Sequence, residues 1–254
     1  MNDYYFPFGQ KLTKVQQTDI TPNKEVFVLG VYASAVHAKW LDKDGNIKVQ
    51  ALAVASEPEI FWTGEGVEKT IADIHTPEEL GKLVPADKNL NGPSGVALDD
   101  LFLKPLGYSR EQAWLCDLLP ESRVNINQKK AVNIYNEIVQ TNKYNLPFAT
   151  IPDFDVNELK INAEIRKVDI LGELETSGAK TIILLGDLPI QWFLKYFDKR
   201  KKLSDFEGYG RKHDIEINKI IYTVIPLCHP RNAARLGAFS KKWAELHDEW
   251  ILNC

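Results

Sequence analysis

The sequence has few cysteines, no long apolar run and no internal repeats, and each of these absences argues against a class of protein. Its three cysteines, Cys116, Cys228 and Cys254, lack C-x-x-C spacing, which argues against a disulfide framework or a zinc site. No apolar run approaches the roughly twenty residues of a membrane span. The N-terminus lacks the basic start and apolar core of a signal peptide. We therefore expect a protein of a reducing, cytoplasmic compartment, with no membrane contact and no metal.

The charge of the chain does not by itself point to a nucleic-acid partner. The formal net charge is −4 over 254 residues, whereas nucleic-acid binding is usually accompanied by an excess of basic residues. The charge is uneven, because residues 195–242 carry twelve lysines and arginines against five acidic residues. A basic binding surface and an ordinary solvated lysine-rich face explain this segment equally well.

Four short apolar runs have the composition of strands that are buried on both faces. They lie at residues 25–29, 112–116, 181–186 and 219–225. Helical patterns alternate with them, at residues 96–103, 128–141, 156–177, 188–197 and 239–252. This alternation predicts a three-layer α/β/α sandwich around a central, mainly parallel, four-stranded sheet.

The remaining segments complete the predicted organisation. Residues 1–24 are expected to form an N-terminal arm, and residues 25–254 a single domain. Asp44-Gly45 lies between two apolar runs and predicts a hairpin, which we place as an ornament on the parallel sheet. We expect a short helix over residues 77–83 and an irregular aromatic loop over residues 56–66.

Polar or small residues follow each predicted strand. The first strand ends in the small-residue turn Gly30 to Ala35, the second in Asp117, the third in Gly186, and the fourth in His229 with Arg231. Ligands of open parallel sheets bind at the carboxyl ends of the strands. The sequence therefore predicts a functional site at this edge, although a loop histidine that only caps a helix is the simpler alternative for His229.

Four segments, in this order, resemble motifs of the uracil-DNA glycosylase superfamily, particularly its compact bacterial and archaeal branches. They are VFVLGVYA at 26–33, a central block from GPSG at 92–95 to WLCD at 114–117, IILLG at 182–186 and VIPLCHP at 224–230. The resemblance covers most of the chain. It implies the family's fold, a monofunctional DNA N-glycosylase that hydrolyses the bond between base and sugar, and damaged or single-stranded DNA as the partner.

The resemblance also implies roles for individual residues. His229 would donate a hydrogen bond to the negative charge that develops on the leaving base. Asp117 would face the Watson–Crick edge of a base that has left the stack. The pocket would be lined by Gly30, Val31, Tyr32, Ser34, Pro93 and Ser94, and the DNA would be met by Arg231, Asn232 and Arg235.

The chain departs from the family's pattern at several of these positions. Tyr32 and its neighbours stand where many members carry an Asp or Asn that positions water, and Asp117 replaces the asparagine of the pocket. Ser94 stands where a stacking aromatic is expected, so Phe61, Trp62 or another ring must supply that wall, if any does. Some branches bind an iron–sulfur cluster through four cysteines, and three are too few, so we expect no cofactor.

Three functions are compatible with these residues. The first is a divergent base-excision N-glycosylase that acts on a non-standard base. The second is a catalytically degenerate module that binds a nucleobase, a nucleotide or damaged DNA, and the third is an enzyme that hydrolyses a free nucleoside or nucleotide. Salt dependence separates the DNA binders from the third, because phosphate contacts release counterions.

The polar residues near the predicted site can also be explained by structural roles alone. His37 reads as a packed or solvent-exposed histidine rather than a base. Glu57 and Glu59 flank Pro58, and they either position a water or, more commonly for loop carboxylates, are solvated. Asp117 either faces a ligand or caps the turn over residues 118–122.

Overall fold

The computed structural model describes residues 3–142, 144–237 and 240–254. Its largest element is a five-stranded sheet in the order β5-β1-β6-β8-β7. The strands are β1 (Val26–Tyr32), β5 (Ala113–Leu119), β6 (Thr181–Leu185), β7 (His213–Ile217) and β8 (Ile220–Leu227). The first four strands of that order run parallel, and β7 pairs antiparallel with β8 at one edge.

All four predicted strands are present, but the predicted number of strands is wrong because β7 adds a fifth. β7 has the sequence HDIEI, whose side chains are alternately buried and partly or fully exposed, so it lacks the apolar run that marks the other four. Asn218 and Lys219 join it to β8, and both have left-handed backbones, with φ of 51° and 67°. A two-residue turn of this kind fits a hairpin, but the pair lacks the glycine that usually signals one.

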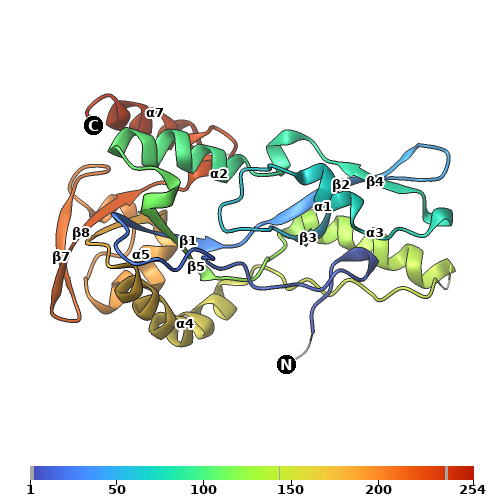
Figure 1. The fold of residues 1–254 in the computed structure, drawn as a ribbon, viewed down its shortest axis with the longest axis horizontal. Helices are drawn as coiled ribbons and strands as arrows, with labels where there is room; N and C mark the ends of the chain where they lie inside the picture. The colour runs from blue at the N-terminus through green and yellow to red at the C-terminus, as the bar shows by residue number, and fades with distance from the viewer. Residues whose placement is uncertain (1–2, 143, 238–239) are drawn as a thin grey trace.

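Helices lie on both sides of the central sheet, with α2 and α7 above it and α4 below it in Figure 1. The helices are α1 (Val67–Ala72), α2 (Pro93–Ala97), α3 (Ile126–Asn142), α4 (Val156–Ser177), α5 (Asp187–Trp192), α6 (Pro230–Ala233) and α7 (Ser240–Ile251). A π-helix, Leu98–Leu103, continues α2. The five helices predicted between and after the strands are confirmed, except that the one expected over 188–197 is divided into α5 and a 3-10 turn. Phe239, the predicted start of the last helix, lies outside the described residues.

A second sheet forms the other half of the molecule, at the right of Figure 1. It contains β2 (Ala35–Leu41), β3 (Ile47–Ser56) and β4 (Lys82–Pro85), in the antiparallel order β3-β2-β4. The predicted hairpin is therefore confirmed, but its placement on the parallel sheet is wrong. The second sheet has a hydrophobic core of its own, in which the ring centroids of Phe8, Trp40 and Tyr135 lie 5.0 to 5.9 Å apart.

The helix predicted over residues 77–83 is also wrong, because only a 3-10 turn, Glu78–Leu80, forms there. Gly81 follows with a φ of 86°, and the chain then enters β4. A Cβ at Gly81 would lie 2.1 Å from the backbone oxygen of Leu41. This close approach lets β4 pair with β2, and tertiary pairing thus overrides the local helical pattern.

The N-terminal segment contacts both halves of the molecule. Phe6, Phe8 and Leu12 are buried in the core of the second sheet, and Val15 is buried in the core of the central sheet. Across the part of the chain that the structure describes, no helix is long and apolar enough to cross a membrane.

Candidate functional site

A cavity of about 730 Å³ opens between the two sheets, at the carboxyl ends of the parallel strands. We call it the carboxyl-edge cavity. β1 ends at Tyr32 and β2 begins at Ala35, so the second sheet starts where the carboxyl edge of the first one lies. One wall therefore comes from the central sheet, and the opposite wall from β2, β3 and the start of α3.

Most of the residues singled out in the sequence meet in this cavity. Those that line it are Val31, Tyr32, Ser34, Pro93, Ser94, Asp117, His229, Arg231 and Asn232. Gly30 lies beneath, where a Cβ would collide with Asp117 and Phe61. Arg235 is not among the lining residues, and its guanidinium instead pairs with Asp248 at 2.5 Å. Its predicted contact with DNA stays a prediction.

His229 has a defined tautomer. It is the N-cap of α6, and its Nδ1 accepts the backbone N–H of Arg231 at 3.2 Å. Burial lowers the pKa of His229 to about 4, and the positive charge of Arg231 adds to the decrease. The ring is therefore neutral at pH 7, and with Nδ1 accepting, its proton is on Nε2. His229 can therefore cap the helix and also donate a hydrogen bond to a ligand, because Nδ1 accepts the capping bond and Nε2 carries the proton.

The loop that carries His229 is fixed from behind by a hydrogen-bonded chain. The N–H of Cys228 donates to the hydroxyl of Tyr209 at 3.1 Å, and that hydroxyl lies 2.6 Å from Nδ1 of His247. Nε2 of His247 lies 2.9 Å from the carbonyl oxygen of Leu101. A carbonyl only accepts hydrogen bonds. His247 therefore donates from Nε2 to Leu101, and its Nδ1 accepts a hydrogen bond from the hydroxyl of Tyr209. Cys228 is fully buried, as expected of a small packed side chain.

Asp117 presents a buried carboxyl with an unused oxygen. It lies beside Gly30 in the β1–β5 pair, and a Cβ at Gly30 would be 2.3 Å from its Oδ1. That oxygen has no hydrogen-bond partner in the described part of the chain. Burial raises the pKa of Asp117 to about 7, although the positive charge of Arg166 opposes the increase. β5 continues to Leu119, so Asp117 is a strand residue, and the described structure shows no capping bond to its carboxyl.

Glu57 is a second buried carboxyl that lines the same cavity, and its burial was not predicted from the sequence. It follows the end of β3 and is 8% exposed, so the prediction of a solvated loop carboxylate is wrong for this residue. It holds for Glu59, which is exposed. Burial raises the pKa of Glu57 to about 8, and the charge of Asp117 contributes to the increase. Two carboxyls that share one site ionise in sequence rather than together.

Phe61 supplies an aromatic wall beside Asp117. Its Cζ would lie 2.6 Å from a Cβ at Gly30, so the ring covers that glycine directly. Its backbone is left-handed, with a φ of 50°, which is uncommon for a bulky residue. Arg110 holds this conformation by donating to the carbonyl of Phe61 at 2.9 Å while it pairs with Asp99. Trp62, the other candidate, also lines the cavity, but most of its side chain is buried in the second core.

The opposite wall carries polar side chains, and the lining there also includes Arg123. His37 is buried, and its Nε2 lies 2.9 Å from Nε2 of Gln128. The side chain of Asn91 bonds the N–H and the carbonyl of His37, at 2.8 and 2.9 Å. Burial lowers the pKa of His37 to about 4, so the ring is uncharged at neutral pH. The prediction of a packed histidine is confirmed.

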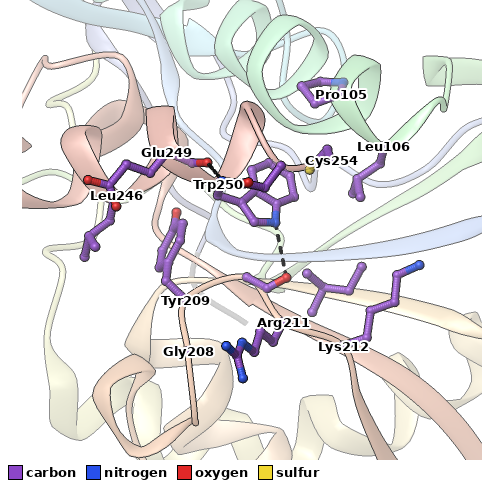
Figure 2. A pocket seen from close by; sticks show the side chains of 13 residues that line it. Pro105, Leu106, Gly208, Tyr209, Arg211, Lys212, Leu246, Glu249, Trp250 and Cys254 are labelled. Carbon is purple, nitrogen blue, oxygen red and sulfur yellow. Dashed lines mark hydrogen bonds between the residues drawn. The ribbon is translucent and has the colours of Figure 1, made fainter.

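A second cavity, of about 690 Å³, lies near the C-terminus, between α7 and the loop before β7 (Figure 2). We call it the C-terminal cavity. The indole nitrogen of Trp250 donates to the carbonyl of Gly210 across it, at 3.2 Å. Arg211 and Lys212 also line it, and the nearest carboxylate to Arg211 is that of Glu207, at 3.9 Å. Among the described residues that line the C-terminal cavity, none is a buried acid or base comparable with Asp117.

Neither metal ligation nor comparison with other proteins adds to this description. Within residues 3–142, 144–237 and 240–254, no group of three or more His, Cys, Asp or Glu side chains is arranged to hold a metal ion. No protein-family model matches the chain, and no curated protein is significantly similar to it.

Proposed function

We propose that the protein is a DNA base-excision N-glycosylase of the uracil-DNA glycosylase type, which hydrolyses the N-glycosidic bond of a base flipped into the carboxyl-edge cavity. The observation that carries the proposal is the neutral His229, with its proton on Nε2, in the same cavity as the buried acid Asp117. A neutral donor and a buried hydrogen-bonding group are what an uncharged base with several carbonyl or amine groups requires.

The chemistry follows from the separation of charge in the reaction. The bond between C1′ and the base nitrogen breaks with its electron pair on the base, so negative charge develops at the base oxygens and positive charge on the sugar. Nε2–H of His229 would stabilise the base anion, as a preorganised donor does in an oxyanion hole. Phe61 would pack against the face of the base, and Asp117 would bond its edge.

Glu57 is our candidate for the residue that positions water, the role for which the first sequence motif offers no carboxylate. In its ionised form it would accept a proton as the water oxygen bonds to C1′. The backbone N–H of Ser34 favours that ionised form. The proton taken from the water is then available to the departing base, so charge and atoms balance without a cofactor.

The second candidate is a module that binds a base without excising it, and one observation favours it. The pKa of Glu57 is about 8, so most of this carboxyl is protonated at neutral pH and accepts no proton from water. The two proposals therefore differ in whether ionised Glu57 forms in the complex, and a rate that rises with pH supports the enzyme.

A panel of single- and double-stranded oligonucleotides, each with one altered base, tests the proposal. We expect abasic sites with at least one base, visible as strand breaks after alkali, and far fewer abasic sites in the same time with Glu57→Gln. Binding without abasic sites, at any pH from about 6 to about 9 around the pKa of Glu57, supports the module instead. Release of base from a free nucleoside, with no salt-sensitive DNA binding, supports the third function.

A further inference from the structure

Two loops of the carboxyl-edge cavity lie backbone against backbone. The loop of residues 60–64 carries the aromatic wall, and the loop of residues 91–95 carries further lining residues of the same cavity. A Cβ at Gly95 would lie 2.1 Å from the carbonyl oxygen of Phe61, and a Cβ at Gly92 would lie 2.0 Å from the backbone of the first loop. Neither glycine has room for a side chain, so the groups that bind both loops determine how they sit together.

Arg110 binds both loops, although it does not itself line the cavity. Its guanidinium donates to the carbonyl oxygens of Ile60 at 3.3 Å and Phe61 at 2.9 Å, and to that of Gly95 at 3.4 Å. The same group pairs side by side with the carboxylate of Asp99, at 2.9 to 3.1 Å. One planar side chain with several fixed donors thus joins the two loops to the π-helix.

The bond to Phe61 bears on the position of its ring. Phe61 has a φ of 50°, a conformation that bulky residues rarely adopt and that persists where the surroundings impose it. Its ring lies directly over Gly30, next to Oδ1 of Asp117. Because the backbone angles set the direction of Cβ, a return of Phe61 to an extended backbone would turn the ring away from Gly30.

We propose that Arg110 is a positioning residue for base recognition, which holds the backbone of Phe61 so that its ring packs against the flipped base. The inference rests on the proposed function, because it assigns the ring to a base. Stacking of a base on an aromatic ring contributes about tenfold or more in affinity. Arg110 would thus influence the choice of base without touching it, and it would act chiefly through Phe61.

The position of the ring can be measured without a substrate. In NMR spectra of the full chain, the α-protons of Gly30 should show a ring-current shift, which Phe61→Leu identifies by abolishing it. Arg110→Gln should remove most of this shift. Arg200→Gln is the matched control and should leave it unchanged. Arg200 pairs with Asp198 through two nitrogens and is 23% exposed, against 22% for Arg110, but it lies beside β7.

The second measurement uses the oligonucleotide that the panel identifies. Arg110→Gln should lower the single-turnover rate at saturating protein by about tenfold. Affinity for an unaltered oligonucleotide should change by less than about twofold, because phosphate contacts dominate it. In the Phe61→Leu background, Arg110→Gln should lower the rate by less than about twofold further, because the ring that it positions is already absent. Arg200→Gln should leave both quantities unchanged.

Arg110→Lys keeps the test decisive if the glutamine variant does not fold, which thermal unfolding reports. Lysine retains the charge beside Asp99 but lacks the planar fork that reaches both loops, so it should also lose the Gly30 shift and slow excision. A shift that both variants leave intact overturns the proposal. Additive losses from Arg110→Gln and Phe61→Leu overturn the action through the ring.

The two measurements also separate this inference from the proposed function. If the shift is lost but the variant excises at the wild-type rate, the ring does not serve the base, and only this inference is overturned. If the wild type neither excises nor prefers any altered base, the proposed function fails, and base recognition by Phe61 fails with it.

Discussion

The carboxyl-edge cavity and the C-terminal cavity have nearly the same volume, about 730 and 690 Å³, but their polar groups differ. In the C-terminal cavity the tryptophan nitrogen donates to a carbonyl, and the hydroxyl of Tyr209 is bonded to His247 and Cys228. In the carboxyl-edge cavity Oδ1 of Asp117 has no hydrogen-bond partner among the residues that the structure describes. Buried polar groups are nearly always paired, so each exception calls for an explanation.

The difference shows that volume alone does not identify a site in this molecule. A buried carboxyl without a partner destabilises the fold, and a ligand that bonds it removes that cost. Two buried acids, of which Asp117 has the unpaired oxygen, converge on the carboxyl-edge cavity together with a neutral histidine and an aromatic wall. We therefore assign the chemistry there, and the predictions below compare the two cavities, starting with the largest expected effect.

Glu57→Gln should have the largest effect on activity. It keeps the size of the side chain but removes the proton acceptor, and general-base catalysis typically contributes about a hundredfold to ten-thousandfold. The wild-type rate should rise with pH toward about 8, the pKa of Glu57, and the variant should lose that rise. Single-turnover rates from about pH 6 to 9 measure this. A variant with the wild-type pH profile would show that another group accepts the proton.

His229→Ala should lower the rate by about a hundredfold to a thousandfold, the usual cost of one oxyanion donor. The fold should persist, because the variant loses only the capping bond to Arg231 while Tyr209 still holds the backbone of Cys228. The measurement is kcat on the base identified in the panel, with thermal unfolding as the check on the fold. A loss below about threefold rejects the role of His229 in the transition state.

The central sheet and its carboxyl edge could be predicted from the sequence because local signals determine them. Each of the four parallel strands contains a continuous apolar run, and each run is followed by a small or polar residue such as Gly30 or Asp117. In a parallel sheet these ends share one edge, so the presence of Asp117 and His229 in one cavity follows from the topology.

The second sheet and Glu57 could not be predicted, because long-range packing determines them. Whether Glu57 is solvated or buried depends on the second sheet closing over the carboxyl edge, and no local pattern encodes that contact. The position of Phe61 depends likewise on Arg110, which is distant in the sequence. A positive φ at a phenylalanine and the burial of a glutamate in a loop both run against local propensity.

Asp117→Asn should change base preference, by about tenfold to a hundredfold. Uracil offers a donor at N3 and an acceptor at O4, which an amide or a protonated acid satisfies at once, whereas a carboxylate only accepts. A mismatched buried polar group costs about 1–3 kcal/mol. With its pKa at about 7, wild-type Asp117 should handle uracil better at pH 6 than at pH 8, relative to amine-bearing bases.

The asparagine variant should handle uracil equally well at both pH values. Rates or affinities of both proteins on matched oligonucleotides measure the effect, and the ratio between two bases removes general effects of pH. If the wild type shows the same preference at both pH values and Asp117→Asn leaves it unchanged, Asp117 does not read the base.

The same substitution should have a smaller, separate effect on stability. A carboxyl whose pKa is raised in the folded state binds more protons than in the unfolded state between about pH 4 and 7. The free energy of unfolding contributed by Asp117 therefore falls as the pH rises through this range, by up to about 1.4 kcal/mol per pH unit. Asp117→Asn removes this dependence, so its stability relative to wild type should increase from pH 5 to pH 8.

Urea unfolding of both proteins at the two pH values measures the difference. Taking the variant relative to wild type removes the contributions of His37 and His229, whose lowered pKa values destabilise the fold at low pH instead. A constant difference between the two proteins would mean that Asp117 ionises normally in the folded state.

The smallest effect is expected in the C-terminal cavity. Arg211 and Lys212 line it, and the side chain of Arg211 is 69% exposed with a distant acidic partner, so neither side chain supports a buried group. Arg211→Ala and Lys212→Ala should change kcat by less than about threefold and stability by less than about 0.5 kcal/mol. A loss of DNA binding that is uniform across bases and shallower in its salt dependence would assign these side chains to phosphate contacts. A loss of excision without a loss of binding would instead contradict the assignment of the chemistry to the carboxyl-edge cavity.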